Sequence, residues 1–295
     1  MDKDNIVATF SITGFDPETG ELGIAVQSKF LAVGSVVPWA EAEVGAIATQ
    51  SLANVSYGPE GLKLLKEGKT PEEVIEILIE NDDESELRQV GIVDAEGNSA
   101  TFTGEGCYEW AGGITGDNFA AQGNILVDKE TVKAMADTFQ SAEGTLAERL
   151  VAGLIAGQKQ GGDKRGRQSA ALYVVKEEGG YGGYNDHYID LRVDDHPTPI
   201  KELKRLLDIF YLYFGDKEVE SVKIEGELIK EIKENLSVLG HYSGKINQEW
   251  DSNIKKSLQD YYQTENFEER DHEEGYIDKD ILDYMRNRVK QEQKE

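Results

Sequence analysis

The sequence predicts an α+β fold in which antiparallel sheets are covered by helices, followed by a small helical domain. Segments typical of strands come in groups, and pairs of amphipathic helices separate the groups. Strand–helix–strand alternation is rare, so a doubly wound parallel sheet is not expected. After Gly215 the chain becomes more charged and continues as three helical patterns.

The first group of strands begins close to the N-terminus. A strand is expected over roughly Ile6–Gly14, and the sequence DPETG at Asp16–Gly20 has the proline and glycine of a hairpin turn. The second strand follows at Glu21–Ser28. A third, Glu43–Ser51, is rich in small residues and alternates weakly, which is typical of a strand covered on both faces.

Two helices are expected next, at Tyr57–Gly68 and Thr70–Asp82. The second has a strong start signal, because Thr70 can cap the helix, Pro71 fits its first position and Glu73 completes a capping box. The remaining elements of the first domain are a hairpin, a strand, two helices, two strands and a long helix. In that order we expect them at Leu87–Gly104, Asn118–Val127, Lys129–Phe139, Thr145–Gly157, Gln168–Lys176, His187–Val193 and Thr198–Phe214.

The predicted domains are residues 1–215 and 216–295. A charged linker or helix start, Asp216–Gly226, leads into helices within 227–247, 248–267 and 277–295. Apolar side chains recur at helical spacing in the first of these helices, which gives it one face to bury.

Composition excludes several classes of protein. The chain has 295 residues, 39% hydrophobic and 30% charged, with a formal net charge of −26. So acidic a surface repels phosphate backbones and anionic lipids, so neither a nucleic-acid nor a membrane partner is expected. Cys107 is the one cysteine, which rules out an intramolecular disulfide. With no signal-peptide pattern at the N-terminus, we expect a cytoplasmic protein.

Motifs for metals and nucleotides are absent. The sequence has no HExxH, no Walker A loop and no GxGxxG after a strand, and its four histidines are scattered. No GxSxG elbow supports a serine triad. We therefore expect neither a metal nor a cofactor.

Two polar, glycine-rich segments could line a site. Gly162–Leu172 carries Asp163 and Arg167 just before a strand, and Gln122 and Asn124 flank a glycine in another strand. Glycine beside amide side chains allows close approach and supplies donors, as an oxyanion pocket requires. A β-bulge or strand end with polar residues satisfying the backbone explains the same pattern.

Thr9 offers sharper chemistry. A threonine hydroxyl needs a base, and a free α-amine on the same residue can act as that base because its pKa lies near 8. Lys29, at the end of the second strand, could approach Thr9 across the hairpin. An ordinary strand threonine and a surface lysine are the structural alternative.

Long motifs resemble the uncharacterised family DUF1028 over roughly Ala8–Leu212. They include the segment from TFSITGFDPETG to GAIATQS, then YGPEGLKLL, LRQVGIVDAEG, FTGEGCYEWAGG, QGNIL, GGDKRGRQSAAL and DLRVDDHPTPIKELKRLLD. The resemblance implies a four-layer αββα sandwich like that of the N-terminal-nucleophile (Ntn) hydrolases, and amide-bond hydrolysis. The tail, from LSVLGHYSGKINQEW to GYIDKDILDYM, resembles a putative peptidoglycan-binding-like domain found at the C-terminus of some members.

Two features depart from the pattern that the resemblance implies. In many members the threonine directly follows the initiator methionine, whereas Met1–Ala8 precede Thr9 here, so exposure of its amine would need self-cleavage or a protease. Proteasome-like relatives end the second strand with an acid and open the third with a lysine. Gln27 stands in the acid's place, and no lysine opens the third strand.

The leading hypothesis is an Ntn-type hydrolase of a small amide, peptide or ureide. Thr9 would be the nucleophile, Lys29 would tune its amine, and Gln122 or Asn124 would hold the oxyanion. The residues expected to bind or orient the substrate are Gln122, Asp163, Arg167 and Ser169.

Two alternatives remain open. A binding or scaffold protein could keep the fold without catalysis, or Ser51, Ser169 or Cys107 could act in the same cleft. The expected partner is a small molecule or peptide, and the Ntn superfamily suggests a homo-oligomer.

Overall fold

The computed structural model describes residues 9–215, 220–270 and 273–293. The chain divides into two compact units between Leu207 and Asp208, and the helix α5 (Pro199–Phe214) runs across that point. The sequence places the boundary eight residues later, after Gly215. The first part of the expected N-terminal strand, Ile6–Ala8, lies outside the described residues.

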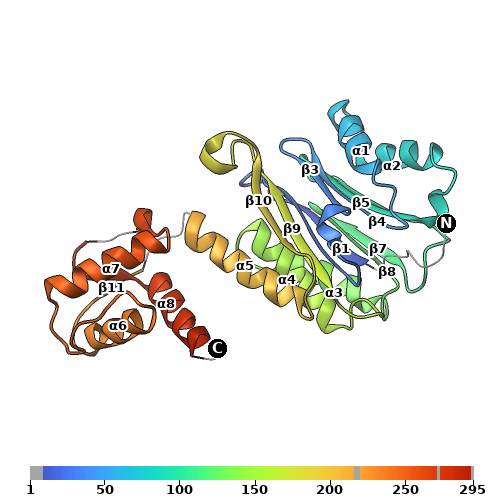
Figure 1. The fold of residues 1–295 in the computed structure, drawn as a ribbon. Coiled ribbons are helices and arrows are strands. Elements are labelled where there is room, and N and C mark those ends of the chain that lie inside the picture. Colours follow the sequence, from blue (N-terminus) through green and yellow to red (C-terminus); the bar gives the residue numbers. More distant parts are fainter. Residues whose placement is uncertain (1–8, 216–219, 271–272, 294–295) are drawn as a thin grey trace. The chain divides into compact units, whose positions relative to one another are not determined.

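The larger sheet of the first unit is antiparallel and has six strands (Figure 1). Across the sheet they are β10 (His187–Val193), β9 (Ser169–Val175), β2 (Leu22–Ser28), β1 (Thr9–Phe15), β8 (Phe119–Asn124) and β7 (Gly112–Gly116). The expected hairpin is present as β1 and β2. Strand β1 is central, so Thr9 lies between two neighbouring strands.

The second sheet has four antiparallel strands and packs face to face against the first. Its strands are β3 (Pro38–Glu41), β4 (Gly45–Ser51), β5 (Arg88–Asp94) and β6 (Ser99–Thr103). Strand β4 contacts β1, and β5 contacts β8. Strands β3 and β7 were not expected from the sequence.

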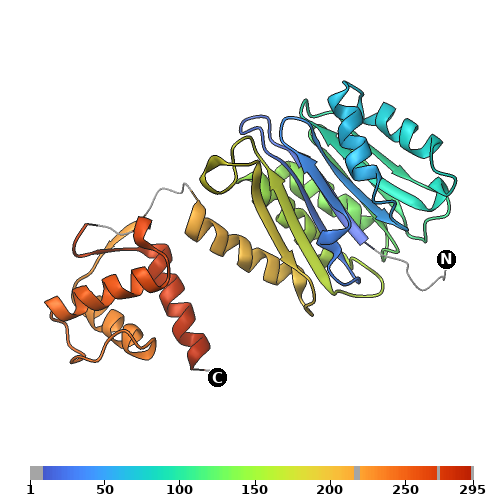
Figure 2. The ribbon, with the colours of Figure 1, turned by 45° about the horizontal axis from the view of Figure 1, so that its top comes forward.

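Helices cover the outer face of each sheet (Figure 2). The helices α1 (Tyr57–Lys66) and α2 (Pro71–Glu80) pack on the four-stranded sheet, and α3 (Glu130–Ser141) and α4 (Leu146–Lys159) on the six-stranded sheet. The capping box predicted at Thr70 is formed. The predicted four-layer αββα sandwich is confirmed.

Alternation along β1 divides its side chains between two environments. Phe10 lies near Gly162, just after α4, and Ile12 lies near Gly153 within α4. Ser11 instead donates a hydrogen bond to Gln50 of the opposite sheet. Because side chains alternate along a strand, Thr9 and Thr13 share the inner face with Ser11. Away from Thr9, the inner face is mainly apolar and its core includes Phe15, Leu22, Ile24, Val26, Ala46, Ala48 and Val93.

The second unit contains the three helices expected from the sequence. They are α6 (Glu227–Val238), α7 (Ser252–Thr264) and α8 (Lys279–Glu292). The unit also contains a two-stranded antiparallel sheet of β11 (Ser221–Lys223) and β12 (Tyr276–Asp278). The short sheet was not expected, because three residues are too few to show alternation. Lys233 is fully buried, and its ammonium donates to Asn247 Oδ1 and the carbonyl oxygen of Glu249.

Candidate functional site

Thr9 lies at the start of β1, between the ends of β2 and β8. Its register partners are Ser28 on β2 and Asn124 on β8, and all three residues are fully buried. Directly opposed residues of antiparallel strands project from the same face, so the three side chains gather between the sheets. The Thr9 hydroxyl donates to Ser28 Oγ over 3.2 Å.

A chain of buried side-chain hydrogen bonds links the sheets beside Thr9. Gln122 Nε2 donates to Ser11 Oγ over 2.7 Å, and Ser11 Oγ donates to Gln50 Oε1 over 2.7 Å. Gln50 Nε2 then donates to Gln89 Oε1 over 2.8 Å, and Asn124 Nδ2 donates to the same oxygen over 3.0 Å. We call these five residues, Ser11, Gln50, Gln89, Gln122 and Asn124, the amide cluster.

The orientation of the amide cluster is fixed by a backbone carbonyl. Gln89 Nε2 donates to the Gly123 carbonyl oxygen and to Thr103 Oγ1, each over 2.8 Å. Since a carbonyl only accepts, Gln89 Oε1 must be the atom that receives Gln50 and Asn124. Two buried oxygens, Asn124 Oδ1 and Gln122 Oε1, then have no hydrogen-bond partner among the described residues.

Gln122 also explains a glycine in the facing strand. An ideal Cβ added to Gly91 on β5 would lie 2.0 Å from Gln122 Oε1. Only the absence of a side chain at this position lets the amide cross between the sheets.

Asp163 anchors a loop at the same end of the sandwich. It is 3% exposed, and its carboxylate accepts the backbone N–H groups of Lys29 and Arg165, each over 2.8 Å. Burial raises the pKa of the Asp163 carboxyl above its usual range, while these N–H groups oppose the shift. The carboxylate therefore holds the loop to the end of β2.

The loop of residues 162–168 spans the strand ends on both sides of Thr9. The Lys164 N–H donates to the Ile125 carbonyl oxygen, just after β8, and the Gln168 N–H donates to that of Ser28, each over 3.0 Å. The predicted Asp163 segment and the predicted Asn124 segment are thus brought to one place.

Other predicted residues have different surroundings. Lys29 and Arg167 are exposed at the surface. Ser169 is buried, and its hydroxyl donates to the Phe30 carbonyl oxygen and accepts the Val33 N–H. Those two bonds hold the chain that follows β2 in place, which is a structural role for Ser169.

Ser28, and not Gln27, is the β2 residue that faces Thr9. Gln27 is in register with Phe10 and Ala170, which puts its side chain on the helix side of the sheet. It is fully buried, and neither polar atom has a partner among the described residues. Alternation along β2 could have shown this, because adjacent residues of a strand point to opposite faces.

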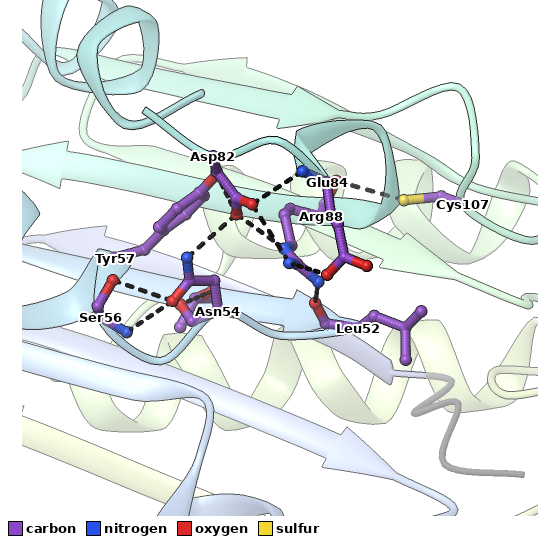
Figure 3. Close-up of polar contacts among 9 residues, drawn as sticks. Leu52, Asn54, Ser56, Tyr57, Asp82, Glu84, Arg88 and Cys107 are labelled. Carbon is purple, nitrogen blue, oxygen red and sulfur yellow. Dashed lines mark hydrogen bonds and ion pairs between the residues drawn. The ribbon is translucent and has the colours of Figure 1, made fainter. Parts of the chain in front are cut away.

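A second polar cluster surrounds Arg88, the residue before Gln89 (Figure 3). Arg88 is 8% exposed, and its guanidinium donates to both Asp82 oxygens, to Glu84 Oε2 and to the carbonyl oxygen of Leu52. We call Arg88, Asp82 and their partners the arginine cluster. It ties the end of β4 to the start of β5.

Further donors complete the contacts of Asp82. Asn54 Nδ2 and the Tyr57 hydroxyl each donate to Asp82 Oδ2 over 3.0 Å. The hydrogen bonds from Arg88 hold the pKa of the Asp82 carboxyl well below its usual range. Burial, with Asp82 as acceptor, raises the pKa of the Tyr57 hydroxyl well above its usual range.

The alternative nucleophiles have contacts suited to structure. Cys107 is buried, and its thiol donates to the Arg88 carbonyl oxygen over 3.3 Å. Burial raises the pKa of this thiol, which lowers the fraction of reactive thiolate. Ser51 is 2% exposed and has φ of 71°, where β4 ends.

Within the described parts of the chain, no group of three or more His, Cys, Asp and Glu side chains could hold a metal ion. The same residues include no helix long and apolar enough to cross a membrane.

Comparison with known proteins identifies the family. The model of the family of unknown function DUF1028 matches residues 9–203, about two thirds of the sequence. The chain belongs to the DUF1028 family. A crystal structure of a DUF1028 protein from Silicibacter pomeroyi is 31% identical, with a TM-score of 0.64, and the match covers 70% of this chain and 91% of that one.

The DUF1028 unit is followed by a second recognised region. The model of a putative peptidoglycan binding domain matches residues 213–285. No curated protein matches the chain. The solved structure of Anbu (ancestral beta-subunit) from Yersinia bercovieri is 14% identical with a TM-score of 0.32, and the match covers 71% of this chain and 100% of that one.

Proposed function

We propose that the DUF1028 unit is an amide hydrolase of the Ntn type, with Thr9 as its nucleophile after removal of Met1–Ala8. The observation that carries the proposal is the environment of Thr9, a buried hydroxyl at the start of a central strand. Beside it lies an amide oxygen that has no partner among the described residues. The match to the family model also begins at Thr9. Its substrate would be a small amide, peptide or ureide.

The reaction begins with hydrolysis of the Ala8–Thr9 peptide bond, which frees the α-amine of Thr9. Thr9 Oγ then attacks the substrate carbonyl carbon while the amine takes the hydroxyl proton. The amine passes that proton to the leaving nitrogen, the C–N bond breaks, and an ester on Thr9 remains. Water, deprotonated by the same amine, hydrolyses the ester and restores the hydroxyl.

Asn124 fits one role in this sequence. Its Nδ2 donates to Gln89 Oε1, and its Oδ1, an acceptor, has no partner among the described residues. An acceptor opposite Thr9 can receive an N–H of the freed amine and aim its lone pair at Oγ. Ser28, which accepts the hydroxyl proton of Thr9, would hold Oγ in place.

The first experiment is an intact-mass measurement on protein purified from its native cells. A mass lacking Met1–Ala8 supports the proposal. The second compares a chain in which the initiator methionine directly precedes Thr9 with the full chain, each treated with a reactive β-lactone. We expect an adduct on Thr9 of the short form alone, none in Thr9→Ala, and a retained adduct in Thr9→Ser. Equal labelling of Thr9→Ala would contradict the assignment.

A binding protein is the second candidate, and one observation favours it. Thr9 is fully buried, with its hydroxyl bonded to Ser28, in the chain that still carries Met1–Ala8. A native mass that retains these residues would support this candidate. For either function we propose a cytoplasmic homo-oligomer, by analogy with the superfamily that the sequence resembles.

A further inference from the structure

Three cations lie exposed at the end of the sandwich that holds Thr9. They are Lys29, Lys164 and Arg167, and within the described residues none of their side chains has an ion pair or hydrogen bond. Arg165 differs, because it pairs with Asp163. The chain carries 57 acidic residues and a net charge of −26, so three unpaired cations on neighbouring segments contrast with its overall charge.

Backbone hydrogen bonds place these cations around Thr9. The Lys29 N–H is bound by Asp163, and Lys29 directly follows Ser28. Lys164 is bonded to Ile125, the residue after Asn124, and Arg167 directly precedes Gln168, which is bonded to Ser28. An exposed cation thus directly follows Ser28, and another is hydrogen-bonded through its backbone to the residue after Asn124. We call Lys29, Lys164 and Arg167 the cationic rim.

The acids that adjoin the rim leave its cations unpaired in the described structure. Ala32 and Gln168 are hydrogen-bonded to Asp194 and His196, so Asp194 and Asp195 lie on an adjoining segment. Glu109 lies on another adjoining segment, because Ile125 and Leu126 are hydrogen-bonded to Tyr108 and Trp110. All three carboxylates are exposed, and none forms an ion pair with a rim cation in the described structure. Like charges held together unpaired repel one another, whereas an anionic ligand would stabilise them.

We propose that the cationic rim binds a carboxylate, and that the substrate class is a small amide carrying a carboxylate near the bond to be cleaved. The substrate class rests on the proposed function, whereas binding at the rim does not. Arg167 can hold a carboxylate through two parallel N–H donors, and the lysines add charge. Lys29 and Arg167 would then recognise substrate rather than tune the amine of Thr9.

The test uses two matched small probes, succinamate and succinamide. Succinamate carries a carboxylate at the position where succinamide carries its second amide. Binding to the full chain is followed by ¹H–¹⁵N chemical-shift titration at low salt. We expect succinamate to bind at least tenfold more tightly than succinamide. The combined change Lys29→Gln and Arg167→Gln should remove that difference, and added salt should weaken it.

Lys256→Gln is the matched control, because it removes one charge from an exposed lysine of the second unit. It should leave the preference for succinamate unchanged. Equal binding of the two probes, or an equal loss in Lys256→Gln, would overturn the proposal. All three substitutions are at exposed positions, so folding should persist, and far-ultraviolet circular dichroism checks this.

Two further measurements separate this inference from the proposed function. Repeating the titration on Thr9→Ala should give the same preference, since binding at the rim needs no catalysis. Hydrolysis of succinamate by the form that begins at Thr9 tests the substrate class. Binding without hydrolysis would refute the substrate class and leave the carboxylate site standing, whereas hydrolysis of succinamide at an equal rate would refute selection by the rim.

Discussion

Arg88 and Gln89 are adjacent in the chain, yet they belong to polar clusters of opposite character. Arg88 points into the arginine cluster, where both oxygens of Asp82 and every nitrogen of the guanidinium have partners. Gln89 points between the sheets into the amide cluster, where two buried oxygens have no partner in the described structure. The alternation of strand β5 separates the two.

The difference indicates what each cluster is for. A buried polar group without a partner destabilises a fold, and it points to function only where other features of a site surround it, as they do at Asn124 but not at Gln27. The arginine cluster, fully satisfied, fastens the end of β4 to β5. The amide cluster holds two acceptor oxygens beside Thr9 that have no partner among the described residues, and a site that binds N–H groups requires such acceptors. Substitution of Arg88 should therefore lower mainly the stability, whereas substitution of Asn124 should lower mainly the activity.

The largest loss of stability should come from Arg88→Met. Removing the guanidinium leaves the Asp82 carboxylate nearly buried and short of its main partner, which should lower the free energy of unfolding by about 4 kcal/mol. Urea unfolding at pH 7 measures this. Arg192→Met, which breaks an exposed pair with Asp190, should change it by less than about 1 kcal/mol. Similar losses in both variants would contradict a structural role for the arginine cluster.

Asp82 gives the same cluster a pH dependence. Its folded pKa lies below its ordinary value, so the pair contributes fully above the ordinary pKa, and the contribution is lost as pH falls toward the folded pKa. We expect the wild-type free energy of unfolding to fall between pH 5 and pH 3, and to fall less in Asp82→Asn. Parallel pH curves for the two proteins would show that Asp82 does not carry this dependence.

Gln89→Leu should destabilise less than Arg88→Met. It removes the acceptor of Gln50 and Asn124 and the donor to the Gly123 carbonyl, none of them charged, and should lower the free energy of unfolding by about 3 kcal/mol. Gln248→Leu removes one hydrogen bond at the surface and should have little effect. A loss below about 1 kcal/mol in Gln89→Leu would show that the amide cluster is not held together at Gln89.

Gly91→Ala tests the close approach of Gln122, and we expect a loss of about 2 kcal/mol from the overlap with its side-chain oxygen. Combining it with Gln122→Ala should recover much of the loss, which is a coupling that a double-mutant cycle measures. Gly153→Ala is the control, because a Cβ in this helix meets no atom closer than 3.5 Å. An uncoupled pair would mean that the strain lies elsewhere.

Local sequence predicted the order of elements well, because the information was local. Thr70, Pro71 and Glu73 signal the start of α2 within four residues, and the capping box is formed. Strands β3 and β7 were missed for a physical reason. One opens with Pro38 and the other contains two adjacent glycines, so neither shows the alternation or the residue types of a strand.

The candidate site was predicted only in part, because its geometry depends on pairing between distant strands. Thr9 and Asn124 meet through the pairing of β1 with β8, and nothing in either segment specifies that register. Ser28 has no motif of its own beside Gln27 and Lys29, and only alternation from Thr9 through the hairpin indicates that it faces Thr9. Gln50 and Gln89 belong to the second sheet, and only the packing of the sheets brings them to Thr9.

The smallest change in stability, with the sharpest loss of function, is expected for Asn124→Leu. Leucine is close to asparagine in shape, and Gln89 Oε1 still accepts from Gln50 after the change. One hydrogen bond is lost and one unpartnered buried oxygen is removed, so the free energy of unfolding should change by less than about 1 kcal/mol. Acylation of Thr9 in the form that begins there should nevertheless fall at least tenfold, because the amine loses its acceptor.

Asn124→Asp sharpens this prediction, since a carboxylate beside the freed amine favours its protonated form and raises its pKa. The pH profile of acylation should therefore shift to higher pH, with the amine needed in its neutral form. Asn98→Asp, at an exposed hairpin turn, adds the same charge away from the site and should leave the profile in place. An unshifted profile in Asn124→Asp, or a loss of more than about 2 kcal/mol in Asn124→Leu, would make Asn124 a structural residue like Asp82, and the contrast between the two clusters would fail.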